Sequence, residues 1–294
     1  MDWKTKRVTA ILEQALIEDH ATHDATTELT LDPKMPASAT ILAKQDCVLA
    51  GWDAIPRILE VFRKLDQSPS RRFEVVHHPE IFDGVRVRKG QAVAVIRGNA
   101  RTILACERVT LNLLQRMCGI ATQTRKYVDA VAGTGVRILD TRKTVPGLRL
   151  LDKYAVSCGG GQNHRMDLAD GVLIKNNHIS LGGGVSKVLA RATKLRKPGQ
   201  KIQVEVRSVE ELNQALTGGA DSLLLDNMTP AEVISAVKIA RKHSEKISIE
   251  ASGGMTLETV RKYAQTGVNY ISVGALTHSV AAIDLSMRIT GEIF

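Results

Sequence analysis

Residues 201–254 read KIQVEVRSVEELNQALTGGADSLLLDNMTPAEVISAVKIARKHSEKISIEASGG, and this stretch decides the fold class. Its short apolar runs at 202–206, 222–226 and 246–250 are typical of strands, and the segments between them carry apolar residues at helical spacing. Strands that alternate with helices form βα units, whose strands pair in parallel. The stretch therefore predicts a parallel sheet covered by helices.

The same alternation continues on both sides of this stretch. Strand patterns precede it in VRILD (136–140) and GVLIK (171–175), and another follows in YISVG (270–274). Six βα units in a row favour a barrel over one open βαβ pair. After the last strand, we expect a closing helix over Val280–Ile289.

The chain before about residue 118 has a different pattern. Strands grouped with helices indicate an α+β domain there. We expect helices over 8–20, Ile55–Leu65 and ARTILACERVTLNLLQRM, a loop over 24–37, and strands in SATILAKQDCVLAG, RRFEVVHH and DGVRVRKGQAVAVIRG.

The composition is that of a soluble globular protein. Of 294 residues, 44% are hydrophobic and 24% charged, which excludes a disordered tail, a collagen-like repeat and a small disulfide scaffold. No run approaches the roughly 20 apolar residues of a membrane helix, and the start of the chain lacks the single apolar block of a signal peptide. We therefore expect a cytoplasmic protein with no membrane partner. Its cysteines form no CxxC pair and are expected to be reduced, mostly buried and without zinc: Cys47, Cys106, Cys118 and Cys158.

The net charge indicates an anionic partner. Lys and Arg number 40 against 31 Asp and Glu, a formal charge of +9. A nucleic-acid-binding protein would account for this charge, but only 3% of the residues are aromatic, too few for a base-stacking platform. The basic residues are also dispersed, so we expect no nucleic-acid partner and look instead at where the cations fall.

Polar residues follow the predicted barrel strands at their carboxyl ends, where barrels place reactive groups. In KIQVEVR, the apolar Ile202 and Val204 alternate with Gln203 and Glu205, so the polar face points into the barrel if the apolar face meets the helices. A half-exposed antiparallel strand would alternate identically, and the flanking helical segments favour the barrel. From the first strand to the fifth, the ends are Asp140-Thr141-Arg142-Lys143, Lys175, Glu205, Asp226 and Glu250.

Cations outnumber carboxylates in this set, so a ligand with several negative charges would balance it. Lys175 closes an apolar run, and lysine is rarely buried without an anionic partner. A single histidine after a glycine turn, such as His164, is more often structural than catalytic. Two spaced carboxylates suit a Mg²⁺ ion that keeps most of its waters and also binds substrate phosphate. The candidates are Arg142, Lys143, His164, Arg165 and Lys175 as cations, with Glu205 and Asp226 as carboxylates.

Small residues follow the last two strands, in Ser252-Gly253-Gly254 and Val273-Gly274-Ala275. Barrels commonly bind a phosphate after late strands through backbone N–H groups. Glycines that only let the chain turn would look the same. The presence of two such turns in consecutive units favours a phosphate site.

The stretch DTRKTVPGLRLLDKYAVSCGGGQNHRMDLADGVLIKNNHI (140–179) resembles, almost position for position, the signature region of the quinolinate phosphoribosyltransferase family. ERVTLNLLQRMCGIAT, VEVRS, LLLDNM, IEASGG and SVGALTHS are similar to it too, in order, so the resemblance covers nearly the whole chain. It implies a type II phosphoribosyltransferase with an N-terminal α+β open sandwich, 1–118, and an irregular, incomplete α/β barrel, 119–278. It further implies that 279–294 returns to the first domain as a helix, and that the protein is at least a homodimer.

The resemblance also implies a reaction and a role for each matching residue. Quinolinate and phosphoribosyl pyrophosphate, with Mg²⁺, would give nicotinate mononucleotide, pyrophosphate and CO₂. Lys143, Lys175, Glu205 and Asp226 would be catalytic, the two carboxylates binding ribose hydroxyls and metal directly or through water. The two quinolinate carboxylates and the pyrophosphate would be bound by Thr141, Arg142, Lys143, His164, Arg165 and Lys175, with Arg108 entering from the neighbouring subunit. The 5′-phosphate would bind Ser252, Gly253, Gly254, Val273, Gly274 and Ala275.

Departures from the family pattern are small, and two other enzymes stay open. The chain has His23-Asp24-Ala25-Thr26-Thr27 where the family often has Gly-Asp-x-Thr-Thr, and Cys118 where serine is frequent. One alternative is a phosphoribosyltransferase that takes nicotinate or another pyridine base without decarboxylation. The other is a Schiff-base aldolase that uses Lys143 or Lys175. Crowded arginines and lysines favour a diacid substrate.

Overall fold

The computed structural model describes residues 1–67 and 72–291, and the chain divides into two compact units. Unit 1 comprises Met1–Arg125, Val145–Gly160 and Val280–Phe294; unit 2 comprises Lys126–Thr144 and Gly161–Ser279. This division differs from the expected boundary between residues 118 and 119. Helix α5 (Arg149–Cys158) belongs to unit 1, whereas the expected barrel domain, 119–278, includes it.

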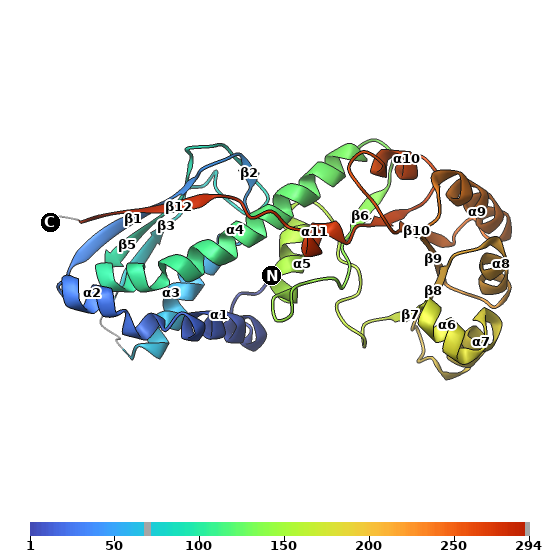
Figure 1. Cartoon of the computed structure of the whole chain (residues 1–294), viewed down its shortest axis with the longest axis horizontal. Helices are drawn as coiled ribbons and strands as arrows, with labels where there is room; N and C mark the ends of the chain where they lie inside the picture. Colours follow the sequence, from blue (N-terminus) through green and yellow to red (C-terminus); the bar gives the residue numbers. More distant parts are fainter. Residues whose placement is uncertain (68–71, 292–294) are drawn as a thin grey trace. The chain divides into compact units, whose positions relative to one another are not determined.

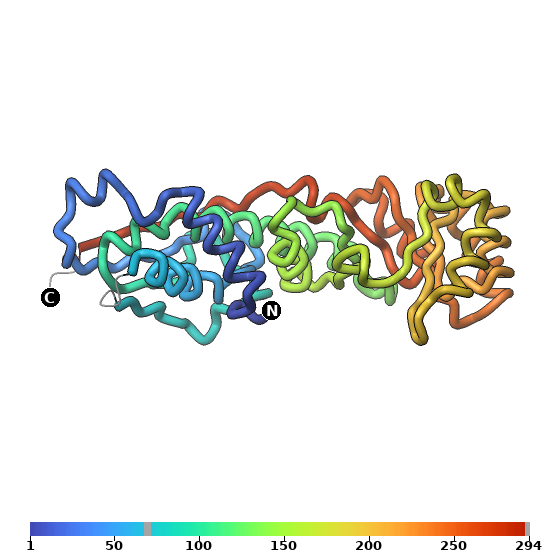
Figure 2. Tube along the Cα trace, turned by 90° about the horizontal axis from the view of Figure 1, so that it is seen from below, coloured from blue at the N-terminus to red at the C-terminus, as the bar shows by residue number. Residues whose placement is uncertain are grey.

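Unit 1 is built on a four-stranded antiparallel sheet with the order β12-β1-β5-β3. The central strand, β1 (Pro36–Ala43), buries alternate residues, as expected for a strand with one face against helices. Helices α1 (Lys6–Glu18) and α3 (Ala54–Leu65) lie on one face of this sheet (Figures 1 and 2). The other elements of this part are α2 (Ala25–Thr30), β2 (Cys47–Val48), β3 (Phe73–Val76), β4 (Arg86–Val87), β5 (Ala92–Asn99), the 3₁₀ turn η1 (Ala21–His23) and, as far as Arg125, α4 (Ala100–Ala130).

Two sequence expectations for unit 1 are wrong. The predicted closing helix over Val280–Ile289 is instead a strand, β12 (Leu285–Gly291), which pairs antiparallel with β1. Its residues LSMRITG alternate apolar and polar with a period of two, so they can complete a sheet edge. The predicted loop over 24–37 contains α2, because the Asp24 side chain accepts the Thr27 N–H at 3.1 Å and so caps a short helix.

Unit 2 contains a six-stranded parallel sheet with the order β6-β11-β10-β9-β8-β7. Each strand from β7 (Val172–Ile174) to β10 (Ser248–Ser252) pairs with the next strand along the chain, and β6 (Arg137–Leu139) pairs with β11 (Tyr270–Ser272). This is the strand order of a barrel that is open between β6 and β7, as the family resemblance implied.

Helices cover the outer side of these strands, as Figure 1 shows for α7, α8 and α9. In β8 (Ile202–Val206), Ile202, Val204 and Val206 are fully buried, whereas Gln203 and Glu205 are half-buried and lie on the opposite face. The remaining elements are α6 (Asn176–Gly182), α7 (Val185–Leu195), α8 (Val209–Thr217), β9 (Ser222–Asp226), α9 (Pro230–His243), β10 (Ser248–Ser252), α10 (Val260–Ala264) and α11 (Ala275–His278).

None of the helices within residues 1–67 and 72–291 has the length and apolar character that a membrane crossing requires. The four cysteines are free thiols; Cys47, Cys106 and Cys118 are buried and Cys158 is half-buried.

Candidate active site

A pocket of about 770 Å³ lies at the carboxyl ends of the unit 2 strands. Parallel strands end on the same side of a sheet, which is why side chains from distant parts of the sequence converge there. The pocket lining includes most of the predicted site residues, namely Thr141, Arg142, Lys143, His164, Arg165, Lys175, Glu205, Asp226, Ser252, Gly253, Gly254, Gly274 and Ala275.

Arg142 and Arg165 both line the pocket; one has a buried donor without a partner, and the other has a lowered pKa. The Nε atom of Arg142 is buried without a hydrogen-bond partner. Burial, and then the nearby charge of Arg142, lower the pKa of Arg165, against a smaller opposing effect from Asp170. A carboxylate ligand would accept from the unsatisfied donor and relieve the repulsion between the two guanidinium groups. This part of the pocket is therefore suited to an acidic ligand.

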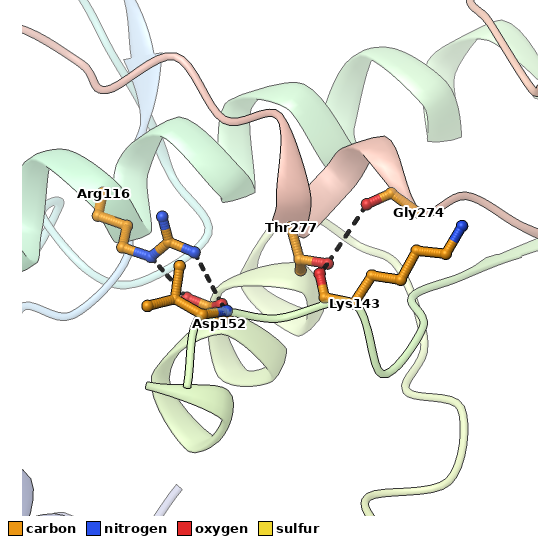
Figure 3. A network of polar contacts seen from close by, with 6 residues as sticks. Arg116, Lys143, Asp152, Gly274 and Thr277 are labelled. Atoms are coloured by element: carbon orange, nitrogen blue, oxygen red, sulfur yellow. Dashed lines mark hydrogen bonds and ion pairs between the residues drawn. The ribbon is translucent and has the colours of Figure 1, made fainter. Parts of the chain in front are cut away.

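The two pocket lysines differ in how they are held. Lys175 directly follows β7 and is exposed, so it is not the buried lysine that its apolar flank suggested. The backbone carbonyl of Lys143 accepts the Thr277 hydroxyl at 2.8 Å (Figure 3). A Cβ atom on Gly274 would lie 3.2 Å from Lys143 Cδ, so the lysine stem passes close to the Gly274 backbone. The 274–278 turn thus positions Lys143.

Within unit 1, the buried carboxylate of Asp152 holds the backbone at Val145, two residues after Lys143 in the sequence. Arg116 donates from Nε and Nη2 to the two oxygens of Asp152, each at 2.8 Å, and Val145 N–H donates to Asp152 at 3.2 Å (Figure 3). Asp152 is fully buried, so its charge needs this bidentate partner.

Glu250 is a pocket residue to which the sequence reading gave no role. It is only 3% exposed, and its Oε2 atom accepts from Gln203 Nε2 at 2.8 Å and lies 3.4 Å from His164 Nε2. Burial raises the pKa of Glu250, but hydrogen bonds from His164, Ser272 and Gln203 outweigh it and lower the pKa overall. The sequence could have indicated Glu250, because this residue lies on the polar face of the alternating segment KISIEAS.

Glu205 is the last residue but one of β8, Asp226 is the last residue of the neighbouring strand β9, and both are half-buried. Glu205 accepts the Asn176 N–H at 3.4 Å, and Asp226 accepts from Asn227 Nδ2 at 2.8 Å. Among the described residues, no group of three His, Cys, Asp or Glu side chains is placed to bind a metal. Two carboxylates on neighbouring strands are a donor set of the kind that binds Mg²⁺ when water and substrate supply the other ligands.

The small turn after β10 has a conformation that requires glycine. Gly253 has φ +99°, and a Cβ atom there would lie 2.2 Å from Asn227 Oδ1. The structure differs from the prediction at Val273, which is buried and does not line the pocket. Its N–H donates to the Leu139 carbonyl at 2.9 Å and so is not available to a phosphate.

Arg108 is not among the lining residues of the pocket. It lies on α4, its side chain is 70% exposed, and it pairs with Glu107 at 3.2 Å. The pocket also contains residues that the sequence reading did not select, most of them next to a predicted site residue: Asn176, Asn177, Asn227, Met255, Thr256, Ser272 and His278.

An incomplete α/β barrel whose strand ends surround a pocket lined by cations, carboxylates and glycine turns offers a site suited to an acidic, phosphorylated ligand. The family model described as quinolinate phosphoribosyl transferase, N-terminal domain, matches residues 24–118, and the one for the C-terminal domain matches residues 120–288. The chain belongs to the quinolinate phosphoribosyltransferase family.

Individual relatives agree with this assignment. The chain is 40% identical over 280 residues to the probable carboxylating nicotinate-nucleotide pyrophosphorylase of Bacillus subtilis, covering 95% of this chain and 92% of that protein. It is 40% identical over 264 residues to the carboxylating enzyme of Mycobacterium leprae, covering 90% of each. The crystal structure of NadC from Streptococcus pyogenes is similar at a TM-score of 0.86 with 35% identity, covering 96% of this chain and 97% of that one.

Proposed function

We propose that this chain transfers the phosphoribosyl group of phosphoribosyl pyrophosphate to quinolinate, and that CO₂ is lost to give nicotinate mononucleotide and pyrophosphate in NAD biosynthesis. The observation that carries this proposal is the pair Arg142 and Arg165, with a buried unsatisfied Nε on one and a lowered pKa on the other. The relatives from B. subtilis and M. leprae are named as carboxylating enzymes, in agreement with it.

The cationic side of the pocket accounts for the choice of a diacid. Quinolinate carries two adjacent carboxylates, and the fork-shaped guanidinium groups of Arg142 and Arg165 suit bidentate hydrogen bonds that also orient the ring. His164 and Lys175 line the same pocket and add to this side. A monoacid such as nicotinate would leave part of this positive charge unbalanced.

In the first step, the ring nitrogen forms a bond to the anomeric carbon of the ribose as the bond from that carbon to the pyrophosphate oxygen breaks. Lys143 and Lys175 stabilise the negative charge that grows on the leaving pyrophosphate. Glu205 and Asp226 stabilise the positive charge that develops at the anomeric carbon.

In the second step, the carboxylate next to the quaternised nitrogen leaves as CO₂. The electron pair of the broken carbon–carbon bond stays on the ring carbon, where the adjacent positive nitrogen stabilises it until a proton is added. This chemistry needs no further organic cofactor.

Mg²⁺ is part of the proposal, and Glu205 and Asp226 would hold it, directly or through water. When bound, it would neutralise charge on the pyrophosphate group. The 5′-phosphate would bind at Ser252, Gly253 and Gly254 on one turn and Gly274 and Ala275 on the other, all of which line the pocket.

We also propose a homodimer or larger homo-oligomer in which Arg108 enters the site of the neighbouring subunit. The exposure of Arg108 supports this, because its side chain is accessible to a partner. The free cysteines support a reducing compartment, so we propose a cytoplasmic location.

Parallel assays of pyrophosphate and CO₂ with quinolinate and with nicotinate test this function. We expect equal amounts of both products from quinolinate and little turnover of nicotinate. A Lys175→Ala variant serves as the matched control and should lose about 100-fold or more in rate, as expected for loss of a group that stabilises transition-state charge. Turnover of nicotinate with no CO₂ from quinolinate would show that the alternative base is the substrate.

A further inference from the structure

The open side of the barrel, between β6 and β7, is where the loop that carries His164 and Arg165 begins. Gln162 lies beside β6, where its N–H donates to the Ile138 carbonyl at 2.8 Å and its carbonyl accepts the Asp140 N–H at 3.1 Å. Leu139 and Gln162 form a parallel bridge outside the named strands. Backbone pairing thus holds the loop at Gln162.

Beyond Gln162, the side chain of Asp140 holds the loop. Its Oδ1 atom accepts the His164 N–H at 2.8 Å, and its Oδ2 atom accepts from Asn163 Nδ2 at 2.6 Å. Asp140 is fully buried and does not line the pocket. A buried carboxylate is costly unless it is hydrogen-bonded, so it strongly favours the loop conformation that supplies these donors.

The ring of His164 is held as well. Its Nδ1 atom accepts the Arg165 N–H at 2.7 Å, and its Nε2 atom faces Glu250 Oε2 at 3.4 Å. The contact to Asp140 therefore places the histidine backbone, and the histidine ring in turn places the backbone of Arg165.

This support matters because Arg165 lies near a second positive charge, that of Arg142. Like charges repel, so the charge of Arg142 disfavours the position of Arg165 beside it when no anion is bound. An anchor that holds the loop in place before the substrate arrives reduces the ordering cost of binding.

We propose that Asp140 is a positioning residue that acts through His164 and Arg165 to set the affinity of the pocket for a pyridine dicarboxylate. The proposal rests on the proposed function, since it names the substrate class of the same site. Asp140 does not line the pocket, so its proposed effect on the substrate is indirect.

Exchanging the amide and the carboxylate tests this role without removing either side chain. Asp140→Asn places one amide NH₂ group against another, and Asn163→Asp places two carboxylates together. Each single variant should raise the KM for quinolinate by about tenfold, with a smaller change in kcat, because a hydrogen bond to a charged group is lost. The double variant Asp140→Asn/Asn163→Asp restores a carboxylate–amide pair and should recover most of the affinity.

Hydrogen exchange at the His164 amide gives a readout that does not depend on activity. It should be protected in the wild type, faster in Asp140→Asn, and slower again in the double variant. Asp221→Asn is the matched control, since Asp221 also accepts a backbone N–H, that of Ile202 at 2.8 Å, but does not line the pocket. It should change neither the KM for quinolinate nor exchange at His164.

The outcomes separate this proposal from the function on which it rests. If the wild type turns over quinolinate but Asp140→Asn changes neither its KM nor exchange at His164, the positioning role is wrong. A folded double variant no better than the single variants would also overturn it. Absence of quinolinate turnover by the wild type would overturn both the function and the substrate class named here.

Discussion

Thr277 is a buried residue whose hydroxyl acts on the pocket through the backbone of Lys143. It donates to the Lys143 carbonyl at 2.8 Å and to the Gly274 carbonyl at 3.4 Å (Figure 3). The lysine that we propose to stabilise pyrophosphate is thus held by a residue 134 positions later in the chain.

Thr277→Val keeps the shape of the side chain and removes the donor. The loss of a neutral hydrogen bond costs about 0.5–1.5 kcal/mol of stability, and we expect kcat to fall about tenfold because Lys143 is no longer fixed. Thr277→Ser keeps the hydroxyl and should retain most of the activity. Steady-state kinetics together with thermal unfolding midpoints would check this.

A matched control is Thr290→Val, which removes a hydroxyl that donates to the Ser38 carbonyl in the unit 1 sheet. Its kcat should be unchanged. Equal losses in Thr277→Ser and Thr277→Val would show that the hydroxyl is not what positions Lys143.

The side chains that line the pocket were easier to predict than those that support them. Arg142, Lys175 and Glu205 follow or end apolar strands, so their places follow from strand alternation and parallel pairing. Asp140, Glu250 and Thr277 act through partners far away in sequence, such as the contact from Asp140 to His164 across 24 positions. No periodic pattern encodes such a contact.

The strands of unit 2 could be predicted because each is a short apolar run followed by a helix. The C-terminal segment was predicted wrongly, because the helix expected over 280–289 overlaps LSMRITG, whose apolar and polar residues alternate as in a strand. What decides the outcome is the free edge of β1, where β12 pairs from Leu285 opposite Ala43 to Gly291 opposite Ala37. Tertiary pairing therefore agrees with the alternation over 285–291 and not with the expected helix.

The turn Ser252-Gly253-Gly254 after β10, where we propose that the 5′-phosphate binds, can be tested at Gly253. Gly253→Ala would force an alanine into φ +99° and push its Cβ atom against Asn227. We expect a loss of stability of about 1–3 kcal/mol and a KM for phosphoribosyl pyrophosphate raised about tenfold or more, since the proposed phosphate turn is displaced. Chemical denaturation and steady-state kinetics would measure the two effects.

Gly199→Ala is the control for backbone strain alone. Gly199 has φ +76°, but a Cβ atom there would meet nothing within 4 Å, and the residue does not line the pocket. The variant should be less destabilised and should bind phosphoribosyl pyrophosphate normally. A normal KM in Gly253→Ala would contradict the placement of the 5′-phosphate at this turn.

Arg108 is a predicted site residue that does not line the pocket. It lies on α4 in unit 1, whereas the lining of the pocket comes from unit 2. Sequence periodicity gave no reason to select a residue in the middle of a helix; only the resemblance to the family did so. Its proposed role requires a second subunit, and this role can be tested by complementation.

Subunits with Arg108→Ala and subunits with Lys175→Ala should each be nearly inactive alone. If Arg108 serves the neighbouring site, a mixed dimer carries both substitutions at one site and neither at the other. Random exchange makes half of the dimers mixed, so an equimolar mixture should regain about one quarter of the wild-type activity. The rate of CO₂ release after subunit exchange measures this recovery.

The control is a mixture of Lys143→Ala subunits with Lys175→Ala subunits. Both lysines belong to one pocket, so every site in a mixed dimer keeps one substitution and no activity should return. Recovery in the control, or none in the first mixture despite proven exchange, would mean that Arg108 does not act across subunits.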